Sequence, residues 1–181
     1  MREGSRDGAR RTGRIAAAVL AALWLGHATP ARSASYDVSI QTAGRSGIAA
    51  RLGFDLVSAN TGVNPVAISQ FSSDATLGGV TNVGGASGAL PGGVAIADSA
   101  FFGSLSQGVT LATTIQFRVT VDEQFGSGLP DQFAFFLLDA SASPVPLFPT
   151  TDPTGAGALF SIDVTGASGG DLGVYAPQGG A

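Results

Sequence analysis

The sequence predicts an all-β protein, a two-sheet antiparallel sandwich of jelly-roll type preceded by a signal-peptide helix. After residue 34, apolar residues alternate with polar ones, helical periodicity is nearly absent, and Gly or Pro interrupts the chain about every ten residues. Alternation with a period of two is typical of strands with one buried face. Such strands bury their apolar faces by packing one sheet on another. A single closed barrel is the alternative.

Residues 1–33 have the pattern of a cleavable secretory signal peptide. An arginine-rich start is followed by the apolar run IAAAVLAALWL and then by small residues at Ala31 and Ser33. This order is typical of a signal peptide, and eleven apolar residues are too few to span a bilayer, which takes about 20. We expect cleavage after Ser33, with Ala31 as the alternative site. The pair Arg10-Arg11 leaves both the Sec and the twin-arginine export routes open. An uncut membrane anchor is the alternative reading of this segment.

Residues 34–175 are expected to form the sandwich, with residues 176–181 as a disordered tail. The predicted strands are Tyr36–Ile40, Ile48–Leu56, Leu111–Val121, Phe133–Leu138, Leu159–Val164 and Leu172–Tyr175, with weaker candidates at Val66–Phe71 and Val94–Ala97. The expected core residues are Phe54, Phe117, Phe133, Phe135 and Leu137.

Three segments have a composition that decides their expected structure. Phe133–Leu138 is apolar on both faces, which predicts a central strand covered on each side. Gly78–Gly93 holds seven glycines, which favours a long flexible loop between sheets. Ser141–Gly157 holds four prolines, and because proline cannot donate to a β-ladder, we expect a loop or a ragged edge there.

Several catalytic chemistries are excluded by residue type once the leader is removed. The only histidine, His27, lies in the leader, and the chain contains no Cys and no Lys. A Ser-His-Asp triad, a thiol nucleophile and a Schiff base are therefore impossible in the mature chain. Three arginines stand against eleven acids after Ser33, which gives a net charge of −8. Such a charge repels nucleic acid. From the missing residue types we predict that the protein is not an enzyme.

Two chemistries of carboxylates stay open. The first is calcium binding through oxygen ligands, for which the candidates are Asp131, Asp139, Asp152 and Asp163, with Asp171 nearby in sequence. The spacing matches no calcium-loop motif, and no other cofactor is expected. The second is glycoside hydrolysis by paired carboxylates, with Asp122, Glu123 and Asp131 as candidates. Asp122 and Glu123 are adjacent on a strand and must point to opposite faces, so solvated turn acids are the simpler interpretation.

Four aromatic residues are candidates for contact with a ligand: Tyr36, Phe101, Phe102 and Tyr175. Exposed, aligned rings on a sandwich would indicate a carbohydrate-binding module. For Phe101 and Phe102, packing in the core or between the sheets is the more ordinary expectation, because large aromatic side chains are mostly buried.

Short motifs spread over Tyr36 to Val164 resemble a known family. They are FSSDATLGG at 71–79, GALPG at 88–92, AFF at 100–102, QGVTL at 107–111, PL at 146–147, TTDPTG at 150–155 and FSIDV at 160–164. The chain resembles small exported bacterial proteins that usually carry a PEP-CTERM sorting tail. That resemblance implies a β-sandwich ectodomain and an association with extracellular polysaccharide and biofilm matrix. After Tyr175 this sequence has only APQGGA, so the sorting tail and its processing are not carried over.

The sequence thus predicts an exported, non-catalytic protein of the bacterial cell surface, periplasm or extracellular matrix. The expected partners are the export machinery, signal peptidase, and extracellular polysaccharide or other matrix components. Nucleic acid is not an expected partner, and we expect no stable membrane span in the mature chain. A carbohydrate-binding module for exopolysaccharide is the first alternative, and a carboxylate-only glycoside hydrolase is the second.

Overall fold

The structure is a computed structural model, and it describes residues 32–59, 62–124, 127–165 and 170–178. Within them the chain forms eleven β-strands and a single 3-10 turn, Ala43–Arg45. The strands are β1 (Arg32–Gln41), β2 (Ala49–Val57), β3 (Val66–Ser73), β4 (Thr76–Val83), β5 (Ala86–Ala89), β6 (Gly93–Ile96), β7 (Phe102–Thr110), β8 (Thr114–Glu123), β9 (Asp131–Asp139), β10 (Phe160–Val164) and β11 (Asp171–Val174). The expected signal-peptide helix lies outside the described residues.

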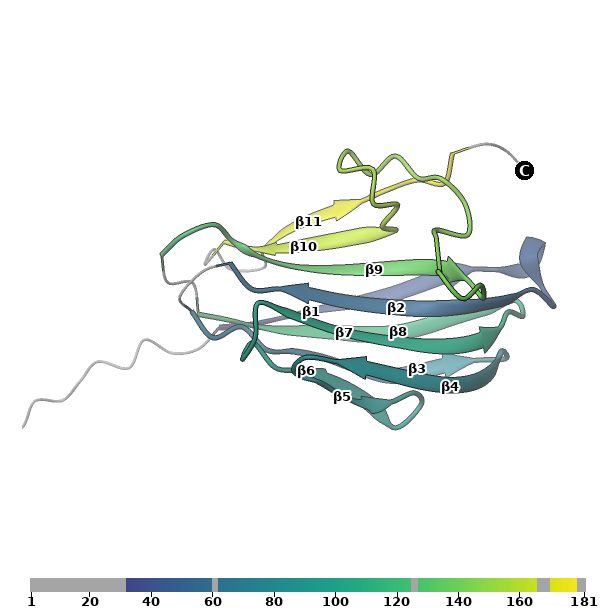
Figure 1. The fold of residues 1–181 in the computed structure, drawn as a ribbon, viewed down its shortest axis with the longest axis horizontal. Coiled ribbons are helices and arrows are strands. Elements are labelled where there is room, and N and C mark those ends of the chain that lie inside the picture. Colours follow the sequence, from purple (N-terminus) through teal and green to yellow (C-terminus); the bar gives the residue numbers. More distant parts are fainter. Residues whose placement is uncertain (1–31, 60–61, 125–126, 166–169, 179–181) are drawn as a thin grey trace, which may run out of the picture.

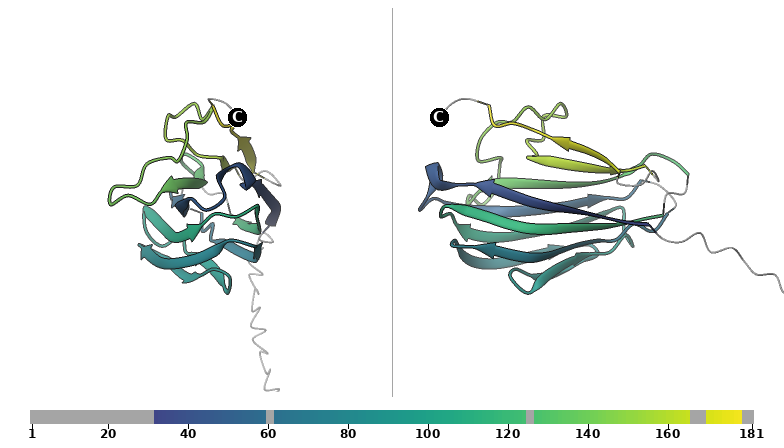
Figure 2. Two further views of the ribbon diagram at one scale, coloured as in Figure 1. Left: turned by 90° about the vertical axis from the view of Figure 1, so that its right-hand side faces the viewer. Right: turned by 180° about the vertical axis from the view of Figure 1, so that it is seen from behind.

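The strands form two antiparallel sheets packed face to face, as the sequence predicts (Figures 1 and 2). Sheet A has the order β1-β8-β3-β6-β5, and sheet B has the order β11-β10-β9-β2-β7-β4. The chain crosses between the sheets at nearly every connection up to β9, so neighbours within a sheet are distant in sequence. This crossing pattern is typical of a jelly roll. Each sheet ends in two edge strands, so the alternative of one closed barrel is wrong.

Aromatic rings from both sheets meet in the core. Phe117 on β8 of sheet A contacts Phe54 and Phe135 of sheet B, with ring centroids 5.5 and 5.1 Å away. Phe135 in turn stacks on Phe160 at 5.5 Å. The five residues expected in the core, Phe54, Phe117, Phe133, Phe135 and Leu137, are all buried. Alternation along β2, β8 and β9 therefore places the predicted side chains on the core face of each strand, as the sequence predicts.

The segment Phe133–Leu138 lies in β9, at the centre of sheet B between β10 and β2. Phe133, Phe135 and Leu137 face the core, whereas Phe136 and Leu138 on the outer face are only half-buried. The loop that follows β9 covers part of this face, since Leu138 forms an isolated bridge with Pro146. The expected central strand is confirmed, and its outer cover is a loop in place of a second layer.

The prediction of a flexible loop at Gly78–Gly93 is wrong. This segment contributes to β4, and it contains β5 and the start of β6. Ladder hydrogen bonds need only the backbone, and glycine allows two backbones to approach closely. A Cβ added to Gly78 would lie 3.4 Å from the carbonyl group of Gly108 on the neighbouring strand. The glycines therefore permit close strand packing here.

Strand β7 was not among the predicted strands, although it lies inside sheet B. Its buried face includes Gln107, which accepts a hydrogen bond from the N–H of Leu90 and donates one to the carbonyl oxygen of Leu90, at 2.8 and 3.1 Å. On the buried face of this strand, Gly103 and Gln107 alternate with Leu105 and Val109, so the apolar pattern is interrupted. The predicted strand beginning at Leu111 starts instead at Thr114, because Leu111 turns to bond Ile48.

The ordered domain is longer than residues 34–175 at both ends. β1 begins at Arg32, which pairs with Glu123 across the ladder. Cleavage after Ser33 would remove the first two residues of this strand, whereas cleavage after Ala31 would leave it whole. At the other end, the N–H of Gln178 donates to Pro149, and Ala176 and Thr151 bond each other. Residues 176–178 are therefore part of the fold and not of a disordered tail.

Substitution of Phe117 by Ala tests the aromatic core. We expect Phe117→Ala to lower the free energy of unfolding by about 3–5 kcal/mol, because it leaves a cavity where the two sheets meet. Urea denaturation measures this change. Phe101→Ala is the control, since Phe101 is 75% exposed and its loss should cost less than about 0.5 kcal/mol. Equal losses for the two variants would contradict this description of the core.

Candidate functional site

A groove of about 520 Å³ lies between the edge strand β1 of sheet A and the edge strand β11 of sheet B. We call it the edge groove; it is lined by residues 36–41, Phe148, Leu159, Phe160, Leu172, Val174, Tyr175 and Pro177. Figure 2 (right) shows β1 in front, in dark blue, with the yellow β10–β11 hairpin above it. The groove is the largest of the three hollows described for this surface, and its walls are mainly apolar.

The edge groove exists because the two sheets do not end together. In β11, Leu172 lies opposite Ile162 and Val174 lies opposite Phe160, so both side chains belong to the core-facing side of sheet B. Yet Leu172 is 49% exposed and Val174 is 74% exposed. The inner face of β11 therefore extends past the edge of sheet A. Leu172 and Val174 are on the side of the sheet that faces the core, but sheet A does not cover them and they contact solvent.

Tyr36 lies on the opposite wall of the edge groove. Its side chain is half-buried, packs against the core, and its hydroxyl oxygen is buried without a hydrogen-bond partner among the described residues. Burial raises the pKa of Tyr36, and the nearby charges of Glu123 and Asp171 raise it further. A buried hydroxyl without a partner is unfavourable by roughly 1–3 kcal/mol, and few buried polar groups in native structures lack one.

The structure brings together two of the four aromatic candidates. Tyr36 and Tyr175 both line the edge groove, although the hydroxyl of Tyr175 lies 2.8 Å from Ser161 Oγ. Phe101 and Phe102 lie elsewhere, beside the end of β2, since Phe102 pairs with Val57. They are 75% and 39% exposed, so the expectation that they pack in the core is wrong.

The calcium candidates do not converge. Asp131 and Asp139 occupy opposite ends of β9, roughly 27 Å apart at about 3.4 Å per residue. Val164 is opposite Asp131, so Asp163, next to it, points to the other face of sheet B and bonds Gln132 at 2.7 Å. Asp152 accepts hydrogen bonds from Thr154 within its own loop. Among the described residues, no three Asp, Glu, His or Cys side chains could hold a metal ion together.

Asp131 is instead part of a buried hydrogen-bond network. It is fully buried at the start of β9, where it accepts hydrogen bonds from the N–H of Ala59 at 2.6 Å and from the side-chain amide of Asn64 at 2.7 Å. Asn64 Oδ1 accepts the N–H of Gln124 at 2.6 Å, and Asp98 accepts the N–H of Asn64. This network connects the β2–β3 loop to the end of β8 and to the start of β9. Its contacts therefore indicate a structural role for Asp131.

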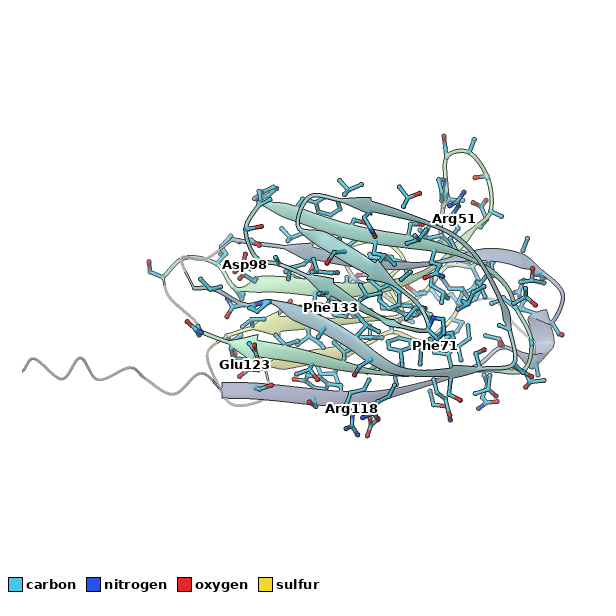
Figure 3. All side chains as sticks on the ribbon, turned by 90° about the horizontal axis from the view of Figure 1, so that it is seen from below. Arg51, Phe71, Asp98, Arg118, Glu123 and Phe133 are labelled. Carbon is cyan, nitrogen blue, oxygen red and sulfur yellow. The ribbon has the colours of Figure 1, made fainter. Side chains whose placement is uncertain are left out.

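Glu123 lies at the same end of the sandwich as Asp98 (Figure 3). It is buried, whereas its neighbour Asp122 is half-buried on the opposite face of β8, as alternation requires. Neither Glu123 nor Asp131 lines the edge groove. A glycosidase needs two carboxyl groups facing a cleft wide enough for a sugar, and the edge groove does not supply that arrangement.

Two other carboxyl groups have pKa values shifted in opposite directions. Burial raises the pKa of Asp55 on β2, while a hydrogen bond from Ser104 at 2.6 Å works against that shift. The hydroxyl and N–H groups of Thr113, with the N–H of Thr114, lower the pKa of Asp74. The first carboxylate therefore opposes folding at neutral pH, and the second favours it.

Sequence reasoning missed three residues of the edge groove: Phe148, Leu172 and Val174. Leu172 and Val174 belong to a predicted strand, and their alternation assigns them correctly to a core-facing side. No local signal shows that sheet A ends before it covers them. Phe148 lies within the proline-rich stretch Ser141–Gly157 that was expected to be a loop or a ragged edge, and its packing on the core depends on a long-range contact.

Comparison of this chain with protein-family models, with curated proteins and with solved structures returns no match. In the described part of the chain, no helix has the length and apolar character needed to cross a membrane.

Removal of the Asp131 carboxylate tests its structural role. We expect Asp131→Ala to lower the free energy of unfolding by at least about 2 kcal/mol, since each buried donor left unpaired costs roughly 1–3 kcal/mol. Thermal and urea denaturation measure this. The control is Asp171→Ala, because Asp171 is exposed and should contribute less than about 0.5 kcal/mol. Full stability of Asp131→Ala would remove the structural explanation and return Asp131 to the list of functional candidates.

Asp55 and Asp74 give a matched test of pH dependence. At pH 7, Asp55→Asn should raise the melting temperature, because it replaces a buried charge and keeps an acceptor for Ser104. The gain should shrink as the pH falls through the raised pKa of Asp55 and should vanish by about pH 3, where the wild-type carboxyl is protonated in the folded and in the unfolded state. Asp74→Asn should lower the melting temperature at pH 7, and this loss should shrink as the pH falls through the lowered pKa of Asp74. Melting curves between pH 3 and 8 check both signs, and the same sign for both variants would contradict the assignment.

Proposed function

We propose that this protein is an exported, non-catalytic binding protein of the bacterial surface or extracellular matrix, and that its edge groove holds a polysaccharide chain. The observation that carries the proposal is the pairing in one groove of apolar walls with the buried, unpartnered hydroxyl of Tyr36. Ligand sites are mostly apolar hollows in which a few polar groups fix orientation.

The chemistry of the edge groove suits a sugar chain. Sugars present apolar ring faces and polar edges, and Tyr supplies an apolar ring with a polar tip. Leu172 and Val174 offer an exposed apolar wall, while Asp37, Ser39 and Gln41 on β1 place polar groups along the rim. The groove follows two strands, so an extended ligand fits it better than a compact one.

The proposed export rests on residues 1–33, whose pattern is that of a signal peptide. The resemblance to exported matrix proteins points the same way. A non-catalytic role is supported by the missing residue types and by the engagement of Asp131 with Ala59 and Asn64.

Titration with oligosaccharides tests the groove. The probes are hexasaccharides of glucose, xylose and mannose, added to the mature domain and followed by isothermal titration calorimetry and by the shift in melting temperature. We expect at least one to bind and to raise the melting temperature, since a ligand of the native state stabilises it by mass action. Tyr36→Phe, which removes only the hydroxyl, should weaken binding about two- to tenfold.

Two further variants locate the binding. Val174→Arg adds a bulky charge at a position that is 74% exposed, so it should block the edge groove without harming the fold. Phe101→Ala is the matched control outside the groove and should leave binding unchanged. The proposal fails if no oligosaccharide binds, or if Phe101→Ala abolishes binding while Tyr36→Phe and Val174→Arg retain it.

A further inference from the structure

A second hollow, of about 490 Å³, lies on the outer face of sheet B across β2, β7 and β4. We call it the Arg51 hollow; besides Arg51 its lining includes Thr76, Gly78, Gly79, Thr81 and Gly108. Arg51 lies between the buried residues Ala50 and Leu52 on β2, so its side chain leaves the sheet on the face opposite the core. The hollow is therefore separate from the edge groove.

Glycines make the floor of the Arg51 hollow. Gly108 stands directly opposite Arg51 in the β2–β7 register, and Gly78 and Gly79 lie beside it, where the β4–β7 register shifts between Leu77 and Val80. Because these glycines have no side chains, the backbone is uncovered next to the arginine. A ligand can approach the sheet surface there more closely than at any position that carries a side chain.

The charge of the Arg51 hollow is opposite to that of the protein. Arg51 is the only charged residue in its lining, although the chain after residue 33 carries a net charge of −8. Hydrogen bonds from Ser141 and Val145 lower the pKa of Asp139, and the charge of Arg51 lowers it further. That carboxylate therefore has partners of its own. The hollow is thus a positive site on an acidic surface.

One donor of the Arg51 guanidinium has no partner, and the side chain forms no ion pair with the described acids. Its Nε is buried and has no hydrogen-bond partner, and no salt bridge joins Arg51 to an acid within the described ranges. By contrast, Arg118 on sheet A forms a two-point ion pair with Asp37, at 2.7 and 2.9 Å. Figure 3 shows Arg51 and Arg118 on opposite sides of the molecule. A half-buried guanidinium that forms no ion pair within the described ranges is a suitable partner for the carboxylate of a ligand.

We propose that the Arg51 hollow binds the carboxylate of an acidic saccharide, a uronate residue of a polysaccharide chain. Arg51 pairs with the carboxylate, and the glycine floor admits the sugar ring. The exposed hydroxyls of Thr76 and Thr81 lie in the same lining, where they can bond the ring hydroxyls. This site does not depend on the edge groove, and either could exist without the other.

Trigalacturonate and its methyl ester, which carries the same rings without charge, are the probes. Isothermal titration calorimetry at low ionic strength on the mature domain should show saturable binding of trigalacturonate and at least tenfold weaker binding of the ester. Arg51→Gln should weaken the binding of trigalacturonate at least tenfold, and Arg51→Lys should restore only part of it because the fork is lost. Arg118→Gln is the matched control and should bind as the wild type does.

A steric variant tests the hollow independently, in case the Arg51 variants fail to fold. A Cβ on Gly108 would meet its neighbours at 3.6 Å, an ordinary contact, so Gly108→Val should fold, fill the hollow and weaken binding with Arg51 intact. Equal binding of trigalacturonate by wild type and Arg51→Gln, equal binding of the ester, or no binding by the wild type overturns the proposal. Tyr36→Phe and Val174→Arg should leave trigalacturonate binding unchanged, which separates this site from the edge groove.

Discussion

Contact between aromatic rings of the two sheets holds this sandwich together. Sheet A contributes a single ring, Phe117, to the cluster, and it packs against Phe54 and Phe135 of sheet B. The sequence contains no cysteine, so no disulfide can replace this packing, and the sheets depend on buried apolar area for their attachment. Because the contact joins interior strands of both sheets, β8 of sheet A with β2 and β9 of sheet B, it helps to fix their relative position and therefore what each outer strand covers.

The edge groove follows from that attachment. Sheet B has one strand more than sheet A, and its additional hairpin, β10–β11, carries the core pattern past the edge of sheet A. Leu172 and Val174 lie opposite the buried residues Ile162 and Phe160, yet both are exposed to solvent. An apolar strip of this kind is unfavourable in water unless something covers it, which is why we place a ligand there.

The charged side chains of this protein differ in whether they have hydrogen-bond or ion-pair partners. Asp131 and Asp152 are buried and bonded by donors of their own surroundings, so their carboxylates stabilise loops. Arg118 is half-buried and paired with Asp37 across the β1–β8 ladder. Arg51 differs from these three, since it has no paired acid among the described residues and borders a hollow lined by glycines. Because Arg51 has no such partner, we propose a ligand there and assign the other three charges a structural role.

Period-two alternation in the sequence was sufficient to identify the all-β class, the sandwich and the core phenylalanines, because alternation is a local property of each strand. It failed at Gly78–Gly93 and at β7, where glycine and buried Gln107 hide the pattern and pairing with neighbouring strands decides the structure. Residue types alone showed that the chain after residue 33 has no imidazole, thiol or amine side chain. Only the tertiary structure decided that Asp131 bonds Asn64, that Tyr36 faces β11, and that Arg51 stands over glycines. Each of those contacts joins residues far apart in sequence, and their geometry depends on how the two sheets pack.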